Sequence, residues 1–408
     1  MKKTALYRAF IVIAIYWLAA CGGGGGGGGG SGATAPPPAA TNMVSIVVDG
    51  GPPGAGAFNL PYISLTICTP GTTQCQTIDH VLVDTGSVGL RLISSALSAS
   101  VNLPVVTSGA SNILECTQFA GGYSWGPLKI ADLKIGNQVV AALPIQVIGD
   151  PIYPNPPASC SNLGNSLNSV AAVGANGVLG VGVHAEDCGP ACAQAASNGV
   201  YFSCSGSCQP ITRDLSQQVP NPVVRFSGDN NGVLIDLPDV PASGATTVNG
   251  SLIFGIGTQA NNNLGNARLL NLNSLGEFTT LYNGNTLTRS FIDSGSNGFF
   301  FPDNGIPLCS PGVSGADFYC PSSTLTLSAI QQSAVDGSNV AINFSVVNAT
   351  AQFSNNPTHA AYNNIGGTLG TKLLSSFDWG SPFFFGRRVF TAIEGRDTPS
   401  GPGPYVAY

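Results

Sequence analysis

Charged residues are scarce in this chain. Asp, Glu, Lys and Arg together make up 8% of its 408 residues, against about 25% in an average soluble protein. Only 14 residues are Lys or Arg, and no basic cluster follows the first few residues. A nucleic-acid-binding surface needs such a cluster to neutralise phosphates. The composition therefore argues against a nucleic-acid partner.

Long helical patterns are missing as well. No extended segment combines helical apolar spacing with the Glu/Lys surface typical of helices. What is present instead is a series of short Val, Ile, Leu and Phe runs, separated by Gly, Asn and Ser in a chain with 54 Gly and 29 Pro. This pattern predicts an all-β protein.

The first 42 residues predict export followed by a tether. Residues 1–20 have a basic start and an apolar run that is too short for a stable spanning helix, which is typical of a signal peptide. Residues 21–42, rich in Gly and then Pro, predict a flexible tether outside the fold. After it roughly 365 residues remain, enough for two cores.

The end of the signal peptide, Leu18-Ala19-Ala20-Cys21, resembles the bacterial lipoprotein box. The resemblance implies that Cys21 becomes the lipidated first residue of the mature protein. Gly22 follows it, which in that family favours the outer membrane. We therefore expect a lipid anchor in the bacterial cell envelope, facing the periplasm or the surface, with simple secretion as the alternative.

Cysteine usage agrees with export. Setting Cys21 aside from the 11 cysteines leaves an even number for an oxidising compartment. Close spacing favours the pairs Cys68–Cys75, Cys188–Cys192, Cys204–Cys208 and Cys309–Cys320, which leaves Cys116 and Cys160. Other connectivities stay open. The rival interpretation is a metal site formed by Cys188, Cys192, Cys204 and Cys208 with His184.

One short pattern occurs twice. The first copy contains Asp84-Thr85-Gly86-Ser87 and the second contains Asp293-Ser294-Gly295-Ser296. In each copy an apolar run precedes the Asp, and a further Gly and an apolar residue follow. The two copies lie about one domain's length apart, so they form an internal repeat.

Chemistry explains why such a turn would be repeated. Gly lets the backbone approach closely, while neighbouring hydroxyl groups can orient a carboxylate; these orienting residues are Thr85, Ser87, Ser294 and Ser296. If the turns meet, Asp84 and Asp293 cannot both ionise easily and share a proton. One carboxyl group could then activate water while the other polarises a carbonyl group. The repeat therefore predicts amide hydrolysis without a covalent intermediate.

These residues resemble the two active-site motifs of the pepsin-like aspartic peptidases. The resemblance implies a two-lobed β fold with a central cleft and one catalytic Asp in each lobe, Asp84 and Asp293. We expect the lobes to span residues 43–225 and 226–408. The chain also resembles a family of bacterial lipoproteins that carry this Asp pair without an assigned activity. Two ordinary strand-to-turn junctions are the alternative interpretation.

A predicted hairpin that begins at Phe119 resembles the flap of that family. The resemblance implies that Phe119, Tyr123 and Trp125 contact substrate, with Phe119 in place of the usual flap Tyr. Arg91 occupies the position of the Trp that partners this Tyr. Arg91 is therefore assigned to the same region, where its charge could lower a carboxyl pKa and disfavour the shared proton. Ordinary hairpin packing is the alternative for the three aromatic residues.

Further segments fit the resemblance. Residues 176–182 resemble the strand that threads beside the first catalytic loop. Its second-lobe counterpart is Asp378-Trp379-Gly380, where Asp378 replaces an expected apolar residue and could bind a backbone amide or Arg387. Three segments are predicted to be strands shared by both halves: residues 221–226, 233–237 and 251–255.

The sequence thus favours an exported, lipid-anchored aspartic endopeptidase that acts on peptides or proteins as a monomer. No cofactor or metal is expected. The alternative is a non-catalytic binding or structural surface lipoprotein that keeps the fold. A serine hydrolase is disfavoured because the second repeat only partly matches Gly-x-Ser-x-Gly and no His is placed to serve it. A glycosidase would also use two carboxylates, but the repeated hydroxyl-Gly-hydroxyl setting favours the peptidase.

Overall fold

The structure is a computed structural model that describes residues 41–310, 317–368, 370 and 374–408. The predicted signal peptide, Cys21 and the tether up to residue 40 lie outside the described residues, so they stay predictions. Among the described helices, none has the length and apolar character needed to cross a membrane.

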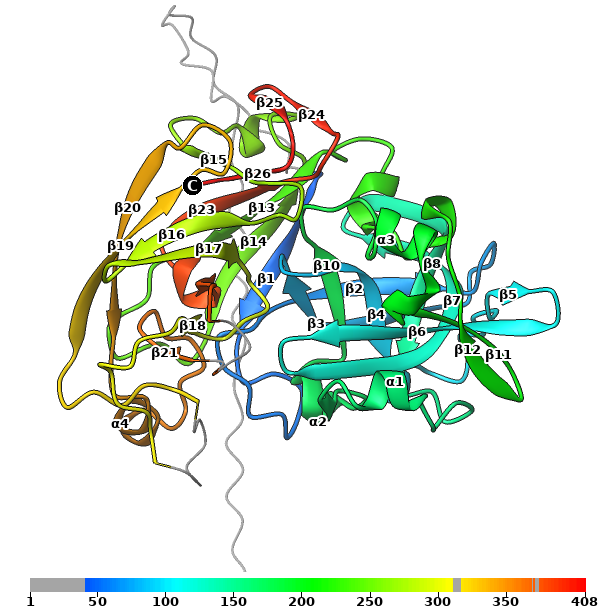
Figure 1. Cartoon of the computed structure of the whole chain (residues 1–408). Helices are drawn as coiled ribbons and strands as arrows, with labels where there is room; N and C mark the ends of the chain where they lie inside the picture. The colour runs from blue at the N-terminus through cyan, green and yellow to red at the C-terminus, as the bar shows by residue number, and fades with distance from the viewer. Residues whose placement is uncertain (1–40, 311–316, 369, 371–373) are drawn as a thin grey trace, which may run out of the picture. The chain divides into compact units, whose positions relative to one another are not determined.

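Strands predominate. They account for 43% of the residues against 11% for helices, which confirms the predicted all-β class. The described strands form one 17-stranded sheet, one 7-stranded sheet and one two-stranded hairpin. Figure 1 shows the blue-to-green strands of the first half and the yellow-to-red strands of the second half as separate groups.

The first repeat lies at the end of a hairpin. Strands β2 (Pro61–Cys68) and β3 (Cys75–Asp84) pair antiparallel, and β3 ends at Asp84. Strand β4 (Val88–Ile93) leaves the turn. Strand β10 (Gly177–Val181) pairs parallel with β3 and antiparallel with β4, so it holds the two sides of the turn together.

The second half builds its repeat in the same way. Strands β16 (Phe278–Tyr282) and β17 (Asn285–Ile292) form the incoming hairpin, and β18 (Phe299–Phe300) leaves the turn. Strand β22 (Asp378–Trp379) pairs parallel with β17 and antiparallel with β18. The internal repeat in the sequence is therefore a repeat of local topology.

A shared part of the large sheet joins the halves. Strand β1 (Met43–Val48) pairs along its whole length with β14 (Val248–Phe254) and at its end with β2. Strand β14 pairs with β13 (Gly232–Leu237), which pairs with β23 (Arg387–Ala392). In Figure 1, β1, β13 and β14 lie between the two groups of strands.

One of the three predicted shared strands was wrong. Residues 221–226 contain the 3₁₀ helix η4 (Pro222–Arg225) instead of a strand. Asn221 caps this helix by accepting a hydrogen bond from the Val223 N–H. Pro222 is favourable at the first helical position because its missing N–H would have no helical partner there. The other two segments lie in β13 and β14.

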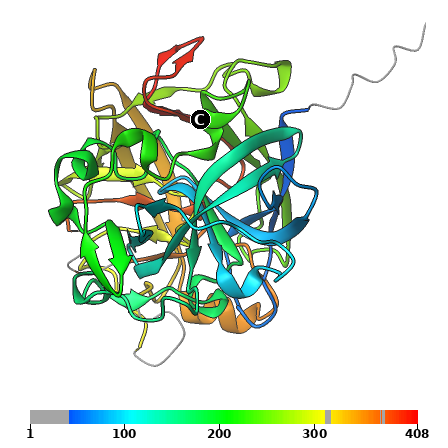
Figure 2. The same ribbon diagram turned by 90° about the vertical axis from the view of Figure 1, so that its right-hand side faces the viewer.

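The predicted flap hairpin is built from β6 (Ser111–Phe119) and β7 (Gly122–Ile135), and β7 continues into β8 (Gln138–Ile148). Short helices cover the ends of the sheets: α1 (Ala158–Ser161), α2 (Val170–Val173), α3 (Pro190–Gln194) and α4 (Ala349–Asn355). Helix α4 and the hairpin of β24 (Asp397–Thr398) and β25 (Gly401–Pro402) lie at opposite ends of the folded unit (Figures 1 and 2).

The other described strands are β5 (Thr107–Ser108), β9 (Asn165–Ser166), β11 (Tyr201–Ser205), β12 (Ser207–Pro210), β15 (Leu269–Asn271), β19 (Leu325–Gln332), β20 (Asn339–Val346), β21 (Gly366–Gly367) and β26 (Tyr405–Ala407). The other described 3₁₀ helices are η1 (Ser94–Ala96), η2 (Ala196–Asn198), η3 (Leu215–Gln217), η5 (Ala260–Asn262) and η7 (Ser381–Phe383).

The four disulfides favoured by close spacing and the bond between the two remaining cysteines are all present, which confirms the predicted pairing. They join Cys68–Cys75, Cys116–Cys160, Cys188–Cys192, Cys204–Cys208 and Cys309–Cys320. The rival metal site is wrong, because its four cysteines are consumed by two of these bonds. No cluster of metal-ligating side chains occurs within the described part of the chain.

Candidate active site

Each repeat holds its Asp in the same way. In the first turn, Asp84 Oδ1 accepts a hydrogen bond from the Gly86 N–H at 2.8 Å, and Oδ2 accepts one from the Ser87 hydroxyl group. In the second turn, Asp293 Oδ1 accepts from the Gly295 N–H at 2.7 Å and Oδ2 from the Ser296 hydroxyl group at 2.9 Å. Both carboxyl groups are thus fixed by their own turns.

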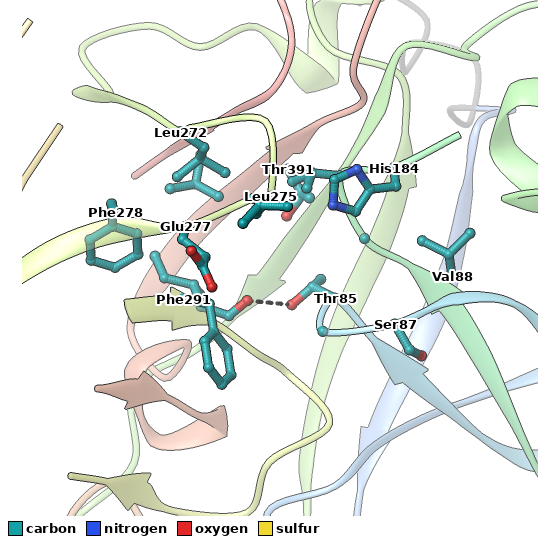
Figure 3. Close-up of a pocket in the computed structure, with 16 residues that line it drawn as sticks. Thr85, Ser87, Val88, His184, Leu272, Leu275, Glu277, Phe278, Phe291 and Thr391 are labelled. Atoms are coloured by element: carbon teal, nitrogen blue, oxygen red, sulfur yellow. Dashed lines mark hydrogen bonds between the residues drawn. The ribbon is translucent and has the colours of Figure 1, made fainter. Parts of the chain in front are cut away.

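The two turns are also bonded to each other. The Thr85 hydroxyl group donates to the Ile292 carbonyl at 3.1 Å (Figure 3) and accepts from the Ser294 N–H at 3.0 Å. The Ser294 hydroxyl group donates to the Val83 carbonyl at 2.7 Å and accepts from the Thr85 N–H at 3.1 Å. These four reciprocal bonds lock the two ends of the repeat face to face.

Glycine is required where the carboxyl groups approach. A Cβ atom on Gly86 would lie 2.5 Å from Asp293 Cγ, and one on Gly295 would lie 2.7 Å from Asp84 Oδ1. Each Asp therefore lies against the turn that carries the other, at a distance that only Gly permits. The structure brings Asp84 and Asp293 together, as the repeat predicted.

The electrostatics of the pair are those of two acids that share a proton. The pKa of Asp293 lies well above its usual value. The main cause is burial; the negative charges of Asp84 and Asp378 and a hydrogen bond with Asp84 raise it further, while the Ser296 hydroxyl group opposes the shift. These causes favour the neutral form of Asp293, so the two turns together can hold one shared proton.

Asp378 is a third carboxyl group at this site. The sequence singled it out only as an unusual residue, and the suggested partner Arg387 is wrong: Arg387 donates to the Phe383 carbonyl, while Asp378 Oδ2 lies 2.6 Å from the Ser296 hydroxyl oxygen. Asp378 is almost fully buried. Its place beside Asp293 could not be read from the sequence, because the contact depends on how β22 pairs with β17.

Arg91 lies in a buried ion-pair cluster, and its assignment to the substrate-clamping region stays a prediction. Its side chain is only 1% exposed and lies against Glu115 at 2.6 Å and Asp187 at 3.3 Å. It also donates to the Thr117 hydroxyl group at 2.9 Å. Because two buried acids surround its guanidinium group, the charge of Arg91 serves to tie β4 to the hairpin strand β6.

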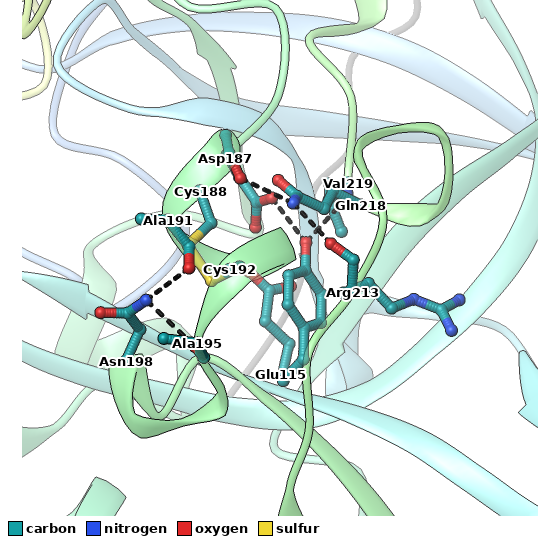
Figure 4. The surroundings of a disulfide bond; sticks show 12 residues. Glu115, Asp187, Cys188, Ala191, Cys192, Ala195, Asn198, Arg213, Gln218 and Val219 are labelled. Carbon is teal, nitrogen blue, oxygen red and sulfur yellow. Dashed lines mark hydrogen bonds between the residues drawn. A yellow bond between two sulfur atoms is a disulfide. The ribbon is translucent and has the colours of Figure 1, made fainter.

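A second ionisable cluster therefore lies behind the hairpin. Burial raises the pKa of Asp187, the neighbouring Glu115 raises it further, and Arg91 and the Tyr201 hydroxyl group lower it. The Tyr201 hydroxyl group donates to Asp187 at 2.5 Å and accepts from the Val219 N–H. Figure 4 shows Glu115 and Asp187 close to the Cys188–Cys192 disulfide. The members of this cluster bond one another and so join β4, β6 and β11.

The hairpin aromatic residues divide into two groups. Trp125 and Tyr123 are buried in a small apolar cluster, and the Trp125 ring N–H donates to the Tyr153 carbonyl. This packing favours the alternative interpretation, ordinary hairpin packing, for these two residues, and their contact with substrate stays a prediction. Phe119 is half-buried at the hairpin tip, where Gly121 is exposed. Phe119 alone keeps a position from which a flap residue could act.

A pocket of about 200 Å³ adjoins the first turn. Its walls come from both halves of the chain and include Thr85, Gly86, Ser87, Phe278, Phe291 and His184. In Figure 3 the Glu277 carboxyl group lies across the pocket from Ser87, and the His184 ring lies above Thr85. His184 pairs with Glu394 at 3.1 Å, and this hydrogen bond raises the pKa of His184. The pocket is therefore mainly apolar with a polar wall.

Comparisons with known proteins agree with this geometry at the level of the fold. Residues 38–408 match the model of a family described as "Protein of unknown function (DUF3443)". No curated protein matches the chain. Among solved structures, the chain is similar to the aspartic proteinase from Irpex lacteus, with a TM-score of 0.53, 14% sequence identity, and coverage of 90% of this chain and 96% of that one. The predicted pepsin-like fold is thus confirmed.

Proposed function

The chain belongs to the family described as "Protein of unknown function (DUF3443)" and has a pepsin-like fold, and from this premise we propose that it is an aspartic-type endopeptidase. The observation that carries the proposal is the contact between Asp84 and Asp293 at two hydrogen-bonded turns. A likeness of fold alone would not assign a reaction. Paired carboxyl groups with a raised pKa on one of them supply the chemistry.

The reaction follows from the two protonation states. Ionised Asp84 acts as general base and removes a proton from a water molecule, whose oxygen attacks the peptide carbonyl carbon. Protonated Asp293 donates a hydrogen bond to the carbonyl oxygen as negative charge develops there. Collapse of the tetrahedral intermediate breaks the C–N bond, and the proton that Asp84 took from water goes to the leaving amine nitrogen. The products are a carboxylic acid and an amine, and no covalent enzyme intermediate forms.

The substrate is an extended peptide or protein segment that lies across the Asp pair. The apolar pocket beside Gly86 takes one of its side chains, and the hairpin tip with Phe119 covers the segment. Because both carboxyl groups must hold one proton between them, activity belongs at acidic pH.

The test is cleavage of a peptide library by the purified protein between roughly pH 3 and 7, read by mass spectrometry. Asp84→Asn and Asp293→Asn should each reduce cleavage at least ~10²-fold, in line with the ~10²–10⁴ that a catalytic acid or base contributes. Asp236→Asn is the matched control, since that acid is partly exposed and pairs with Arg388. Absence of cleavage by the unmodified protein, or cleavage that survives Asp84→Asn, contradicts the proposal.

A non-catalytic binding protein is the second candidate. It is favoured by the burial of Tyr123 and Trp125, which leaves the hairpin with a reduced set of residues to clamp a substrate. In this case Asp84→Asn should preserve the cellular phenotype of the folded protein. Loss of the phenotype with unchanged folding excludes this candidate.

The location belongs to the proposal too. The enzyme is held at the bacterial outer membrane by a lipid on Cys21, and the Gly- and Pro-rich tether gives it reach. Palmitate labelling of the wild type and of Cys21→Ser tests the anchor, with globomycin as a second probe. No label on the wild type, or equal label in both forms, contradicts a lipid on Cys21.

A further inference from the structure

One hydroxyl group lies between two carboxyl groups at the second turn. Ser296 Oγ is 2.9 Å from Asp293 Oδ2 and 2.6 Å from Asp378 Oδ2. Asp378 itself is 1% exposed, so solvent water cannot donate hydrogen bonds to its carboxyl group. A hydroxyl group has a single proton and can donate it to only one of these two neighbours.

The second carboxyl group must therefore carry a proton of its own. If both acids were ionised, one of them would face the lone pairs of Ser296 Oγ. Asp293 has a further donor, the Gly295 N–H at 2.7 Å. Asp378 Oδ1 has no hydrogen-bond partner among the described residues. An unpartnered buried oxygen costs more free energy on an anion than on a neutral acid, so Asp378 keeps a proton of its own even when Asp293 is ionised.

We infer that Asp378 is a positioning residue, a neutral carboxylic acid that donates to Ser296 Oγ and so directs the Ser296 hydroxyl proton to Asp293. The inference rests on the proposed function, because the role it assigns concerns how the Asp pair holds its shared proton. Asp378 does not touch the reacting atoms and acts only through Ser296.

The first half of the molecule shows that the fold does not need an acid here. Val178 of β10 pairs with Leu82, two residues before Asp84, and Asp378 of β22 pairs with Phe291, two residues before Asp293. The two positions are equivalent, yet the first half has an apolar residue and the second a buried acid. Packing alone therefore does not account for Asp378.

The surroundings of Asp378 keep it neutral. Burial raises its pKa well above the usual value and the charge of Asp84 adds to this, while the Ser296 hydrogen bond opposes it. Asp293 is the other titratable group that it faces. The strand beside it, β18, places Phe300 opposite, and Trp379 next to it stacks on Phe377 at 4.0 Å. A neutral Asp378 also removes the repulsion that would raise the pKa of Asp293 further.

Two substitutions separate a neutral acid from an ionised one. Asp378→Asn keeps a donor toward Ser296, and Asp378→Val installs the residue that Val178 supplies in the first half. For a neutral Asp378, the alkaline limb of kcat/KM against pH stays within about 0.2 pH of the wild type in the Asn variant. In the Val variant it moves up by about 0.5 pH, because the Ser296 bond to ionised Asp293 weakens.

Other results overturn the inference. A limb that moves to lower pH in both variants identifies an ionised Asp378, since a negative charge has then been removed. A limb that moves in neither variant identifies a residue without influence on the pair. As a control, adding Asp378→Val to Ser296→Ala should not shift the alkaline limb further, because the Ser296 hydroxyl group that connects Asp378 to Asp293 is already absent.

A readout independent of turnover keeps this inference separate from the proposed function. Carbon-13 NMR of Asp-labelled protein, with the Asp378 signal assigned by its loss in Asp378→Asn, should show a protonated carboxyl group throughout roughly pH 4 to 7. The Asp293 titration should move to higher pH in Asp378→Val or, if that variant does not fold, in Ser296→Ala. An Asp378 signal that ionises below about pH 5, or an unmoved Asp293 titration, refutes the inference even if no peptide is ever cleaved.

Discussion

At the scale of single residues, two groups of buried ionisable side chains are strongly constrained. Asp293 and Asp378 lie at the joined turns, and Arg91 lies in a closed cluster with Glu115 and Asp187. A buried charge is costly unless it is paired or neutralised. Asp293 and Asp378 avoid this cost by holding protons, whereas Glu115 and Asp187 lie against the Arg91 guanidinium group.

Because the pKa of Asp293 is raised in the folded protein, the free energy of unfolding should depend on pH. Because the folded protein binds this proton more tightly than the unfolded chain, the stabilising contribution is present at low pH and is lost as pH rises through the folded-state pKa. Asp293→Asn should therefore raise the free energy of unfolding at pH 7 and leave it nearly unchanged at pH 3. Urea unfolding at both pH values measures this, and an equal effect at both would contradict it.

Arg91 predicts a large loss of stability on substitution. Arg91→Ala leaves two buried acids without their cation, and such a change costs about 3–5 kcal/mol in the free energy of unfolding. Arg388→Ala is the matched control, because its pair with Asp236 is exposed and is worth about 0–1 kcal/mol. Chemical denaturation of both variants decides; similar losses would show that the Arg91 cluster is not buried.

At the scale of secondary-structure elements, most of the arrangement could be predicted from local sequence. Asp84 and Asp293 were found because the same turn chemistry occurs twice at the end of an apolar strand. The strand expected at residues 221–226 was wrong, because Pro222 and the Asn221 cap decide the local structure in favour of η4. The apolar content of the segment alone does not distinguish a strand from a short 3₁₀ helix.

Contacts between distant elements could not be predicted in the same way. Arg91 meets Asp187 across 96 residues, and Ser296 meets Asp378 across 82. Nothing within a segment specifies such a partner, because it depends on strand pairing and on which side chains share a buried space. This is why the buried acids around Arg91 were not predicted and why Asp378 was noticed without its partner Ser296.

The lengths of the loops that the disulfides close predict how much each bond contributes to the free energy of unfolding. The Cys116–Cys160 bond spans 44 residues and ties β6 to α1, whereas Cys188–Cys192 spans only 4. Closing the longer loop restricts the unfolded chain more, so the loss of stability should be about 4 kcal/mol for the Cys116→Ala/Cys160→Ala variant and about 2 kcal/mol for the Cys188→Ala/Cys192→Ala variant. Urea unfolding without reductant compares the two, and the reverse order would contradict the loop argument.

At the scale of the whole folded unit, the two copies of the repeat are joined twice. The pairing of β1 with β14 runs through the shared sheet, and reciprocal bonds between Thr85 and Ser294 join the turns. The candidate site lies at the second of these joints, so its geometry depends on both halves being folded together.

This connection predicts cooperative unfolding. Scanning calorimetry of the oxidised protein should give one transition, with equal calorimetric and van't Hoff enthalpies, because neither half keeps its strand partners when the other unfolds. Asp293→Asn should move that single transition without splitting it. Two separate transitions would mean that the halves fold independently and that the joint is weak.

The most direct test of the central claim is calorimetric titration with a statine-containing peptide, whose hydroxyl group mimics the tetrahedral intermediate. The account predicts one binding site, an affinity at least 10-fold higher at about pH 4.5 than at about pH 8 because the ligand needs the shared proton, and a further loss of at least 100-fold in Asp84→Asn. Binding that is absent in the wild type, or that is the same in Asp84→Asn, would contradict the assignment of Asp84 and Asp293 as one catalytic pair.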